Sequence, residues 1–97
     1  MIATVAAKTA YIRSDGRFFI GADTMSGSFD RGDVITVPLD NMPPFVRRID
    51  RIFFVATETG NQQSLMFKNI EPETAQLVIS AVASGMSLEI SREPIVD

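Results

Sequence analysis

The sequence predicts a mostly β protein: a six- to seven-stranded antiparallel barrel with one helix at about 72–84, all in a single domain over residues 1–97. Apolar and polar residues alternate through the first two thirds of the chain, which is the period of a strand with one buried face. Turn signals containing Gly, Pro or Asp recur at short intervals, and no regular strand–helix alternation suggests parallel βαβ units. A length near 100 residues suits one domain with its own core.

Composition argues against several kinds of chemistry. The 97 residues contain no histidine, cysteine or tryptophan, and nine basic side chains oppose twelve acidic ones, for a net charge of −3. Structural zinc, iron–sulfur clusters and thiol chemistry therefore lack their usual ligands, and the commonest general base near neutral pH is missing. We expect no enzymatic activity, no catalytic residue, no metal and no cofactor. The net charge gives no overall attraction to nucleic acid or to an anionic membrane.

The N-terminal segment is not typical of a targeting sequence. Lys8 interrupts the mildly apolar stretch Met1–Ala7 before a secretory hydrophobic region forms. No apolar run approaches the roughly 18–20 residues that a membrane-spanning helix needs. The sequence therefore predicts a soluble, cytoplasmic protein without membrane association.

The first predicted hairpin joins Thr9–Arg13 to Arg17–Ala22. Between them lies Asp15-Gly16, a pair that favours a two-residue type I′ turn because both positions need positive φ. This register places Ile12 opposite Phe19. Both faces of the hairpin carry apolar side chains, so we expect cover on both sides.

The next strands are bounded by turn residues. Gly27 and the Asp30–Asp33 cluster flank a short strand or corner, and the β-branched run Val34–Val37 predicts a strand that ends at Pro38.

Phe45–Ala56 is the longest strand signal. Val46 and Ile49 are three residues apart, which breaks the alternation, and a β-bulge near Arg47-Arg48 would restore it. The apolar run Ile52–Val55 requires cover on both faces. We expect the helix to cover its outer side; the alternative is another chain.

The last third of the chain changes from strand to helix and back. Gly60-Asn61 predicts a turn, followed by a strand over Ser64–Ile70. Pro72 in a first turn flanked by acidic residues favours a helix start, and Gly85 is expected to follow its C-cap. Met86–Ser91 alternates again and should complete the sheet.

Five glycine and apolar motifs occur in a recognisable order. They are Gly16–Gly21, Ser26–Ile35, Val46–Ile49, Leu65–Ile70, and Gly85–Leu88 ahead of Pro94. This order resembles the second domain of translational GTPases of the elongation factor Tu type. The resemblance implies a translation-protein β-barrel, which in that family contacts ribosomal RNA, the aminoacyl end of tRNA or sister domains.

The chain departs from that family in two ways. Residues 71–84 are longer and more helical than the family's short connection, and no G-x-x-x-x-G-K-[ST] phosphate loop is present. The resemblance therefore implies a stand-alone barrel domain without the G domain, and GTP binding does not transfer to it.

The candidate binding residues are Arg47, Arg48 and Arg51. One interpretation is an anion or RNA-phosphate patch, with Phe45 as a stacking neighbour. The other is an exposed strand face on which Asp50 pairs locally and the arginine stems cover apolar surface.

The helix is apolar on nearly all sides. It either caps an open end of the barrel as core, or leaves one side for a partner. Under the second interpretation, Val78, Val82 and Phe54 are the candidate oligomer contacts.

Five aspartates recur in the first half of the chain, and a carboxylate pair or cation site would need several of them together. Most lie beside Gly, Ser, Asn or Pro, so turn chemistry is the better explanation. The residues are Asp15, Asp23, Asp30, Asp33 and Asp40.

We therefore expect a non-catalytic binding or interaction module whose partner is another protein or a second copy of itself. The alternative is an RNA- or ribosome-associated accessory domain that uses Arg47, Arg48 and Arg51.

Overall fold

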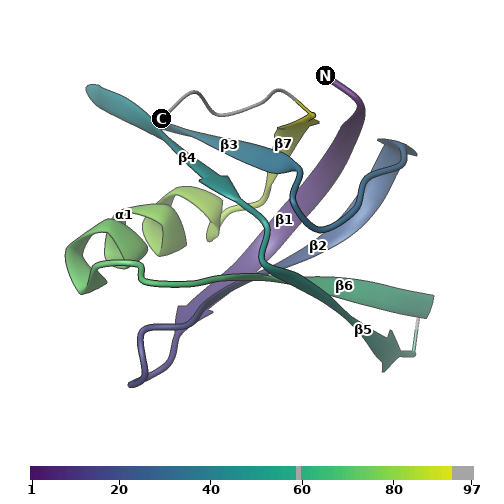
Figure 1. The fold of residues 1–97 in the computed structure, drawn as a ribbon, viewed down its shortest axis with the longest axis horizontal. Helices are drawn as coiled ribbons and strands as arrows, with labels where there is room; N and C mark the ends of the chain where they lie inside the picture. The colour runs from purple at the N-terminus through teal and green to yellow at the C-terminus, as the bar shows by residue number, and fades with distance from the viewer. Residues whose placement is uncertain (59, 93–97) are drawn as a thin grey trace.

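The structure is a computed structural model that describes residues 1–58 and 60–92 (Figure 1). Within those residues it contains seven strands and one helix. In chain order they are β1 (Ala3–Ile12), β2 (Phe18–Gly27), β3 (Val34–Leu39), β4 (Met42–Arg48), β5 (Arg51–Thr57), β6 (Gly60–Phe67), α1 (Pro72–Val82) and β7 (Met86–Ser91). The strands form one antiparallel sheet in the order β4-β3-β7-β1-β2-β6-β5. The predicted mostly β, antiparallel fold with one helix is confirmed.

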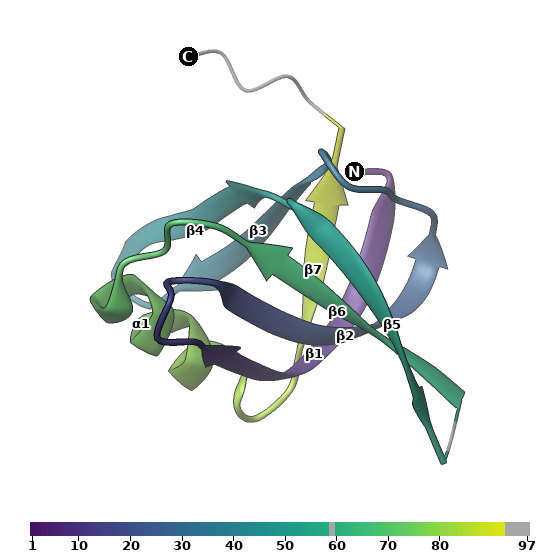
Figure 2. The same cartoon turned by 60° about the horizontal axis from the view of Figure 1, so that its bottom comes forward.

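The sheet curls but does not close, and its two edge strands are consecutive in the chain (Figure 2). Ile49 bonds to the loop before β3: its N–H donates to the Asp33 carbonyl at 2.9 Å, and its carbonyl accepts from Gly32 N–H at 2.8 Å. The next residue, Asp50, donates its N–H to the Met66 carbonyl of β6 at 2.9 Å. The chain thus leaves one edge of the sheet and joins the other within one residue.

This change of partner replaces the predicted bulge at Arg47-Arg48, which was wrong. The pairing of β4 with β3 is regular from Phe45 to Arg48, and the register shift lies instead beside Pro43-Pro44. Ile49 is buried because it sits where the chain passes between the edges. The broken alternation in the sequence therefore marks a corner.

The core lies inside the curl, and α1 packs on β1 and β3 at one end (Figure 1). Ala75, Val78 and Val82 form the buried face of the helix. The helix ends close to its predicted boundary: Gly85, at φ +86°, donates its N–H to the Val82 carbonyl at 2.9 Å. Among the described residues, no helix has the length and apolarity to cross a membrane.

The first hairpin forms, but its predicted register is wrong by one residue. Arg13 and Arg17 close a three-residue loop in which Gly16 has φ +84°, so Ile12 lies opposite Phe18. Such a loop needs only one left-handed residue, and glycine supplies it. A slip of one residue changes every cross-strand pair. Phe18 is therefore a core residue opposite Ile12, and Phe19 lies on the outer face opposite Tyr11.

The second predicted turn is also displaced. Thr57 pairs with Gly60, so both Gly60 and Asn61 belong to β6, and the turn begins at Glu58. Thr59 and Pro94, the latter part of the family motif, lie outside the described residues.

Candidate functional site

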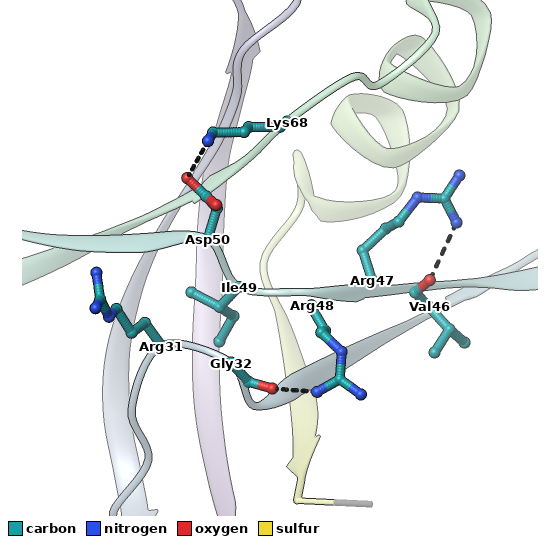
Figure 3. A pocket seen from close by; sticks show the side chains of 8 residues that line it. All are labelled: Arg31, Gly32, Val46, Arg47, Arg48, Ile49, Asp50 and Lys68. Carbon is teal, nitrogen blue, oxygen red and sulfur yellow. Dashed lines mark hydrogen bonds and ion pairs between the residues drawn. The ribbon is translucent and has the colours of Figure 1, made fainter. Parts of the chain in front are cut away.

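A surface hollow of about 670 Å³ lies where the chain passes from β4 to β5 (Figure 3). Four basic side chains and one acidic side chain line it. Its lining residues are Arg31, Gly32, Val46, Arg47, Arg48, Ile49, Asp50 and Lys68. They come from the β2–β3 loop, the end of β4, the β4–β5 junction and the residue after β6. We call this the basic hollow.

Interactions with the backbone hold two of these arginines in place. Arg48 donates from Nη1 to the Gly32 carbonyl at 2.7 Å, and Arg47 donates from Nη1 to the Val46 carbonyl at 3.1 Å (Figure 3). The Arg47 guanidinium carbon also lies 5.4 Å from the centre of the Phe45 ring, within cation–π range. Neutral carbonyls and an aromatic ring do not neutralise these positive charges, although the Asp33 carboxylate attracts Arg48 electrostatically.

Phe45 is not the stacking surface expected from the sequence. Its ring is 3% exposed and packs edge-on against Phe18 and Phe67 in the core. No base can reach its face, so this prediction is wrong.

Lys68 carries the hollow's one ion pair among the described residues. Its Nζ lies 3.5 Å from Asp50 Oδ2, which is long for a charge-assisted hydrogen bond. Asp50 Oδ2 is itself buried and accepts no hydrogen bond from a described residue. The lysine side chain stays largely exposed, so solvent weakens the pair and Lys68 keeps the capacity to bind a second anion.

A smaller hollow of about 220 Å³ adjoins the first on the outer face of β2, β6 and β5. Its lining is Arg17, Arg51, Phe53, Met66 and Lys68, so Lys68 belongs to both hollows. Six of the nine basic side chains therefore border two adjoining hollows. We call these six the basic surface: Arg17, Arg31, Arg47, Arg48, Arg51 and Lys68.

The three predicted arginines all lie on the basic surface, and sequence reasoning missed the other three. Arg51 opens onto the smaller hollow, whereas Arg47 and Arg48 line the larger one. Arg17, Arg31 and Lys68 are distant in sequence, and the fold brings them there. The pairing of β6 with β2 and β5 brings Arg17 and Lys68 there, and the bonds between Ile49 and the loop before β3 bring Arg31.

Little negative charge opposes the basic surface. Among the described carboxylates, two form ion pairs with the basic surface. Asp50 pairs with Lys68, and Asp15 Oδ2 lies 3.6 Å from Arg17 Nε on the exposed loop. Arg31, Arg47, Arg48 and Arg51 form no ion pair with a described carboxylate. The rest of the chain holds only three basic side chains (nine minus six) and most of the twelve acidic ones.

Aromatic side chains lie beside the smaller hollow. Tyr11 stacks on Phe19 with ring centres 4.9 Å apart and planes 12° apart, and the Phe53 ring centre lies 6.4 Å from that of Phe19. Phe19 is buried between its neighbours, while Tyr11 and Phe53 are 53% and 45% exposed. The expected outer cover of the hairpin thus comes from the sheet's own aromatic row.

Strand β5 is not covered as expected. Helix α1 packs on β1 and β3 and not on β5 at the sheet's edge, so Phe54 and Val55 are 70% and 49% exposed. Val78 and Val82 face the core and are fully buried. They cannot be oligomer contacts, which corrects that prediction; Phe54 remains accessible.

The aspartates in the described turns act through the backbone, as predicted. Asp15 Oδ1 accepts from Arg17 N–H at 3.1 Å, Asp30 Oδ1 from Arg31 N–H at 2.8 Å, and Asp33 Oδ2 from Asp30 N–H at 2.8 Å. Over residues 1–58 and 60–92, no three acidic side chains gather as a metal site would require.

Known proteins do not identify the chain. No protein-family model matches it, and no curated protein or solved structure is significantly similar to it. The resemblance to the second domain of elongation factor Tu therefore stays a prediction.

Proposed function

We propose that this protein is a non-catalytic binding module that holds single-stranded nucleic acid on its basic surface. The observation that carries the proposal is the convergence of six of nine basic side chains on two adjoining hollows. Phosphate contacts from Lys and Arg supply most of the affinity for nucleic acids that a protein binds without sequence preference.

The aromatic row favours a single strand over a duplex. Phe53 exposes ring surface beside Arg17 and Arg51 in the smaller hollow, and Tyr11 exposes its ring at the far end of the row, beyond Phe19. Unpaired bases stack on such rings with about 1–3 kcal/mol per base. A duplex keeps its bases stacked internally and offers no ring faces to these side chains. The combination of a cationic groove and flanking aromatics is typical of single-strand binding.

The acidic remainder of the molecule confines the binding to this surface. With a net charge of −3, long-range attraction to a polyanion is weak, so binding depends on the local surface. The resemblance to translation-factor barrels adds an analogy toward RNA, and analogy at the level of fold is weak support for function.

Fluorescence anisotropy of labelled short oligouridine and oligothymidine at low salt tests the proposal. We expect the logarithm of the association constant to fall linearly with the logarithm of the salt concentration. RNA should bind more tightly than DNA only if the protein contacts the 2′-hydroxyl. Arg31→Gln should make this salt slope less steep by about 0.7, because the variant binds one phosphate fewer.

Lys8→Gln is the matched control, because Lys8 is exposed, carries the same charge as Arg31 and lies outside both hollows. Absence of binding at low salt, or equal weakening by Arg31→Gln and Lys8→Gln, would contradict the proposal.

A further inference from the structure

Among residues 1–58 and 60–92, Asp33 is the one buried side chain that carries a charge. It directly precedes β3, whose first residue, Val34, pairs with Arg48 of β4 on one side and with Ser91 of β7 on the other. Two arginines therefore flank its carboxylate: Arg48 ends β4, and Arg92 directly follows β7. Both guanidinium groups attract the carboxylate electrostatically.

Arg92 occupies both oxygens of this carboxylate. Its Nε donates to Oδ1 at 3.0 Å and its Nη2 to Oδ2 at 3.1 Å, while the Asp30 N–H donates to Oδ2 at 2.8 Å. Arg48 instead donates to the carbonyl of Gly32, the residue before Asp33. A carboxylate is the stronger acceptor of the two. With Arg92 in place, Arg48 is left with the neutral carbonyl.

We propose that Arg92 is a positioning residue of the basic hollow: it occupies the Asp33 carboxylate and thereby keeps the Arg48 guanidinium available to bind phosphate. This inference rests on the function proposed above. Asp33 is 4% exposed, and a buried carboxylate without a cation is costly. Without Arg92, Arg48 is the remaining cation that attracts Asp33. Its movement onto the carboxylate would take one positive charge from the hollow.

The position of Arg92 makes its effect on binding indirect. Arg92 lines neither hollow, and its side chain is 63% exposed. It acts through Asp33 on Arg48, which does line the larger hollow. The proposal therefore predicts that a residue in contact with no phosphate changes the number of phosphates that the protein binds.

The salt dependence of oligouridine binding, measured with the full chain by fluorescence anisotropy, tests this role. Arg92→Gln should make the salt slope less steep by about 0.7, because Arg48 turns to Asp33 and one phosphate contact is lost. Adding Asp33→Asn to Arg92→Gln removes the carboxylate and should restore the wild-type slope. In an Arg48→Gln background, Arg92→Gln should change the slope no further.

Two further variants separate this role from a structural one. Lys8→Gln removes the same charge outside both hollows and should leave the slope unchanged. Arg92→Lys keeps a cation at the carboxylate and should retain the wild-type slope. If Arg92 served stability alone, Arg92→Gln would reduce the number of folded molecules and the apparent affinity. The slope would stay unchanged, since each bound molecule would make the same phosphate contacts.

The pKa of Asp33, measured by carboxyl carbon NMR, reports the same competition without nucleic acid. The charged groups around this carboxylate are Arg92 after β7, Arg48 at the end of β4, and Asp30 in its own loop. In Arg92→Gln the pKa should stay below its ordinary value, because Arg48 replaces the lost cation. Adding Arg48→Gln should then raise the pKa, whereas Arg48→Gln alone should have a much smaller effect.

Three results would overturn the proposal. They are an Arg92→Gln variant with the wild-type salt slope, an Asp33 pKa that Arg48→Gln leaves unchanged in the Arg92→Gln background, and an Arg92→Gln variant that does not fold although Arg48 is present. If the wild type binds no oligonucleotide, the function proposed above fails. The NMR measurement still decides in that case whether Arg92 and Arg48 compete for Asp33.

Discussion

Arg92 holds Asp33 through both carboxylate oxygens: Nε donates to Oδ1 at 3.0 Å and Nη2 to Oδ2 at 3.1 Å. Asp33 is buried at the start of β3, and Arg92 directly follows β7. These hydrogen bonds outweigh the desolvation of the carboxylate and hold the pKa of Asp33 below its ordinary value of 3.8. The pair fixes the β3–β7 end of the sheet and orients the loop that carries Arg31.

The first prediction concerns this carboxylate and pH. Because folding lowers the pKa of Asp33, its charge stabilises the fold fully above pH 3.8, and the contribution is lost as pH falls through the lower folded pKa. Asp33→Asn keeps an oxygen for Asp30 N–H but removes the charge. We expect it to lower the free energy of unfolding at neutral pH, with the difference shrinking below about pH 3.8.

Urea unfolding at a series of pH values measures this difference. Asp23→Asn is the control, since Asp23 is exposed and forms no ion pair with a described residue. A wild-type advantage that persisted unchanged to the lowest pH would contradict the assignment.

The second prediction concerns two glycines with positive φ. Gly27 has φ +74°, and a Cβ there would collide with the Ile2 carbonyl oxygen and lie 2.9 Å from Ala3 Cα. Gly16 has φ +84° with open space around it. Gly16→Ala should cost about 1–2 kcal/mol of unfolding free energy from the backbone alone, and Gly27→Ala clearly more.

The comparison of the two variants by thermal unfolding separates backbone strain from steric clash. Equal losses of stability at the two positions would show that β1 moves away from Gly27 at no cost.

The third prediction concerns the two faces of α1. Val78 is fully buried and Leu77 is exposed at the preceding position. Val78→Asp buries an unpaired charge and should destabilise the monomer by about 3–5 kcal/mol, whereas Leu77→Asp should have little effect. Circular dichroism during denaturant unfolding measures both. Retained stability in Val78→Asp would mean that the helix is not part of the core.

The fourth prediction concerns the aromatic row and nucleic acid. Removing the exposed ring in Phe53→Ala should weaken oligonucleotide binding by about 1–3 kcal/mol, the stacking energy of one base. Phe54→Ala removes the same ring from the next position on β5, whose side chain points to the opposite face. Anisotropy titrations of both variants measure the difference, and equal effects would place the bases elsewhere.

The sequence predicts individual strands, turns and helix ends because residues close together in the chain determine them. The β-branched run Val34–Val37 lies in β3, and Gly85 ends the helix with positive φ. The first hairpin was also placed correctly, but its register depended on whether one or two loop residues adopt positive φ. Asp-Gly permits both, and only the structure shows that Gly16 alone does so.

The basic surface and the exposure of β5 could not be predicted, because they depend on pairing between strands that are distant in the sequence. The broken alternation between Val46 and Ile49 was visible, but a bulge and a corner produce the same pattern. Whether Ile52–Val55 is covered depended on where α1 docks, and α1 packs on β1 and β3. Arg17 and Lys68 join Arg47, Arg48 and Arg51 because β6 lies between β2 and β5, and Arg31 joins them because the β2–β3 loop bonds to Ile49.

Composition and local pattern thus settle the kind of chain this is: a β protein with one helix, without histidine or cysteine, in which Asp15, Asp30 and Asp33 bond the backbone of turns. Tertiary structure decides where its surfaces are. Side-chain periodicity shows which residues alternate between the two faces of a strand. Which side chains are exposed, and which basic residues gather in one place, depends on which strands become neighbours and which edge the helix leaves open. For this protein those two outcomes placed six cations together and left β5 uncovered.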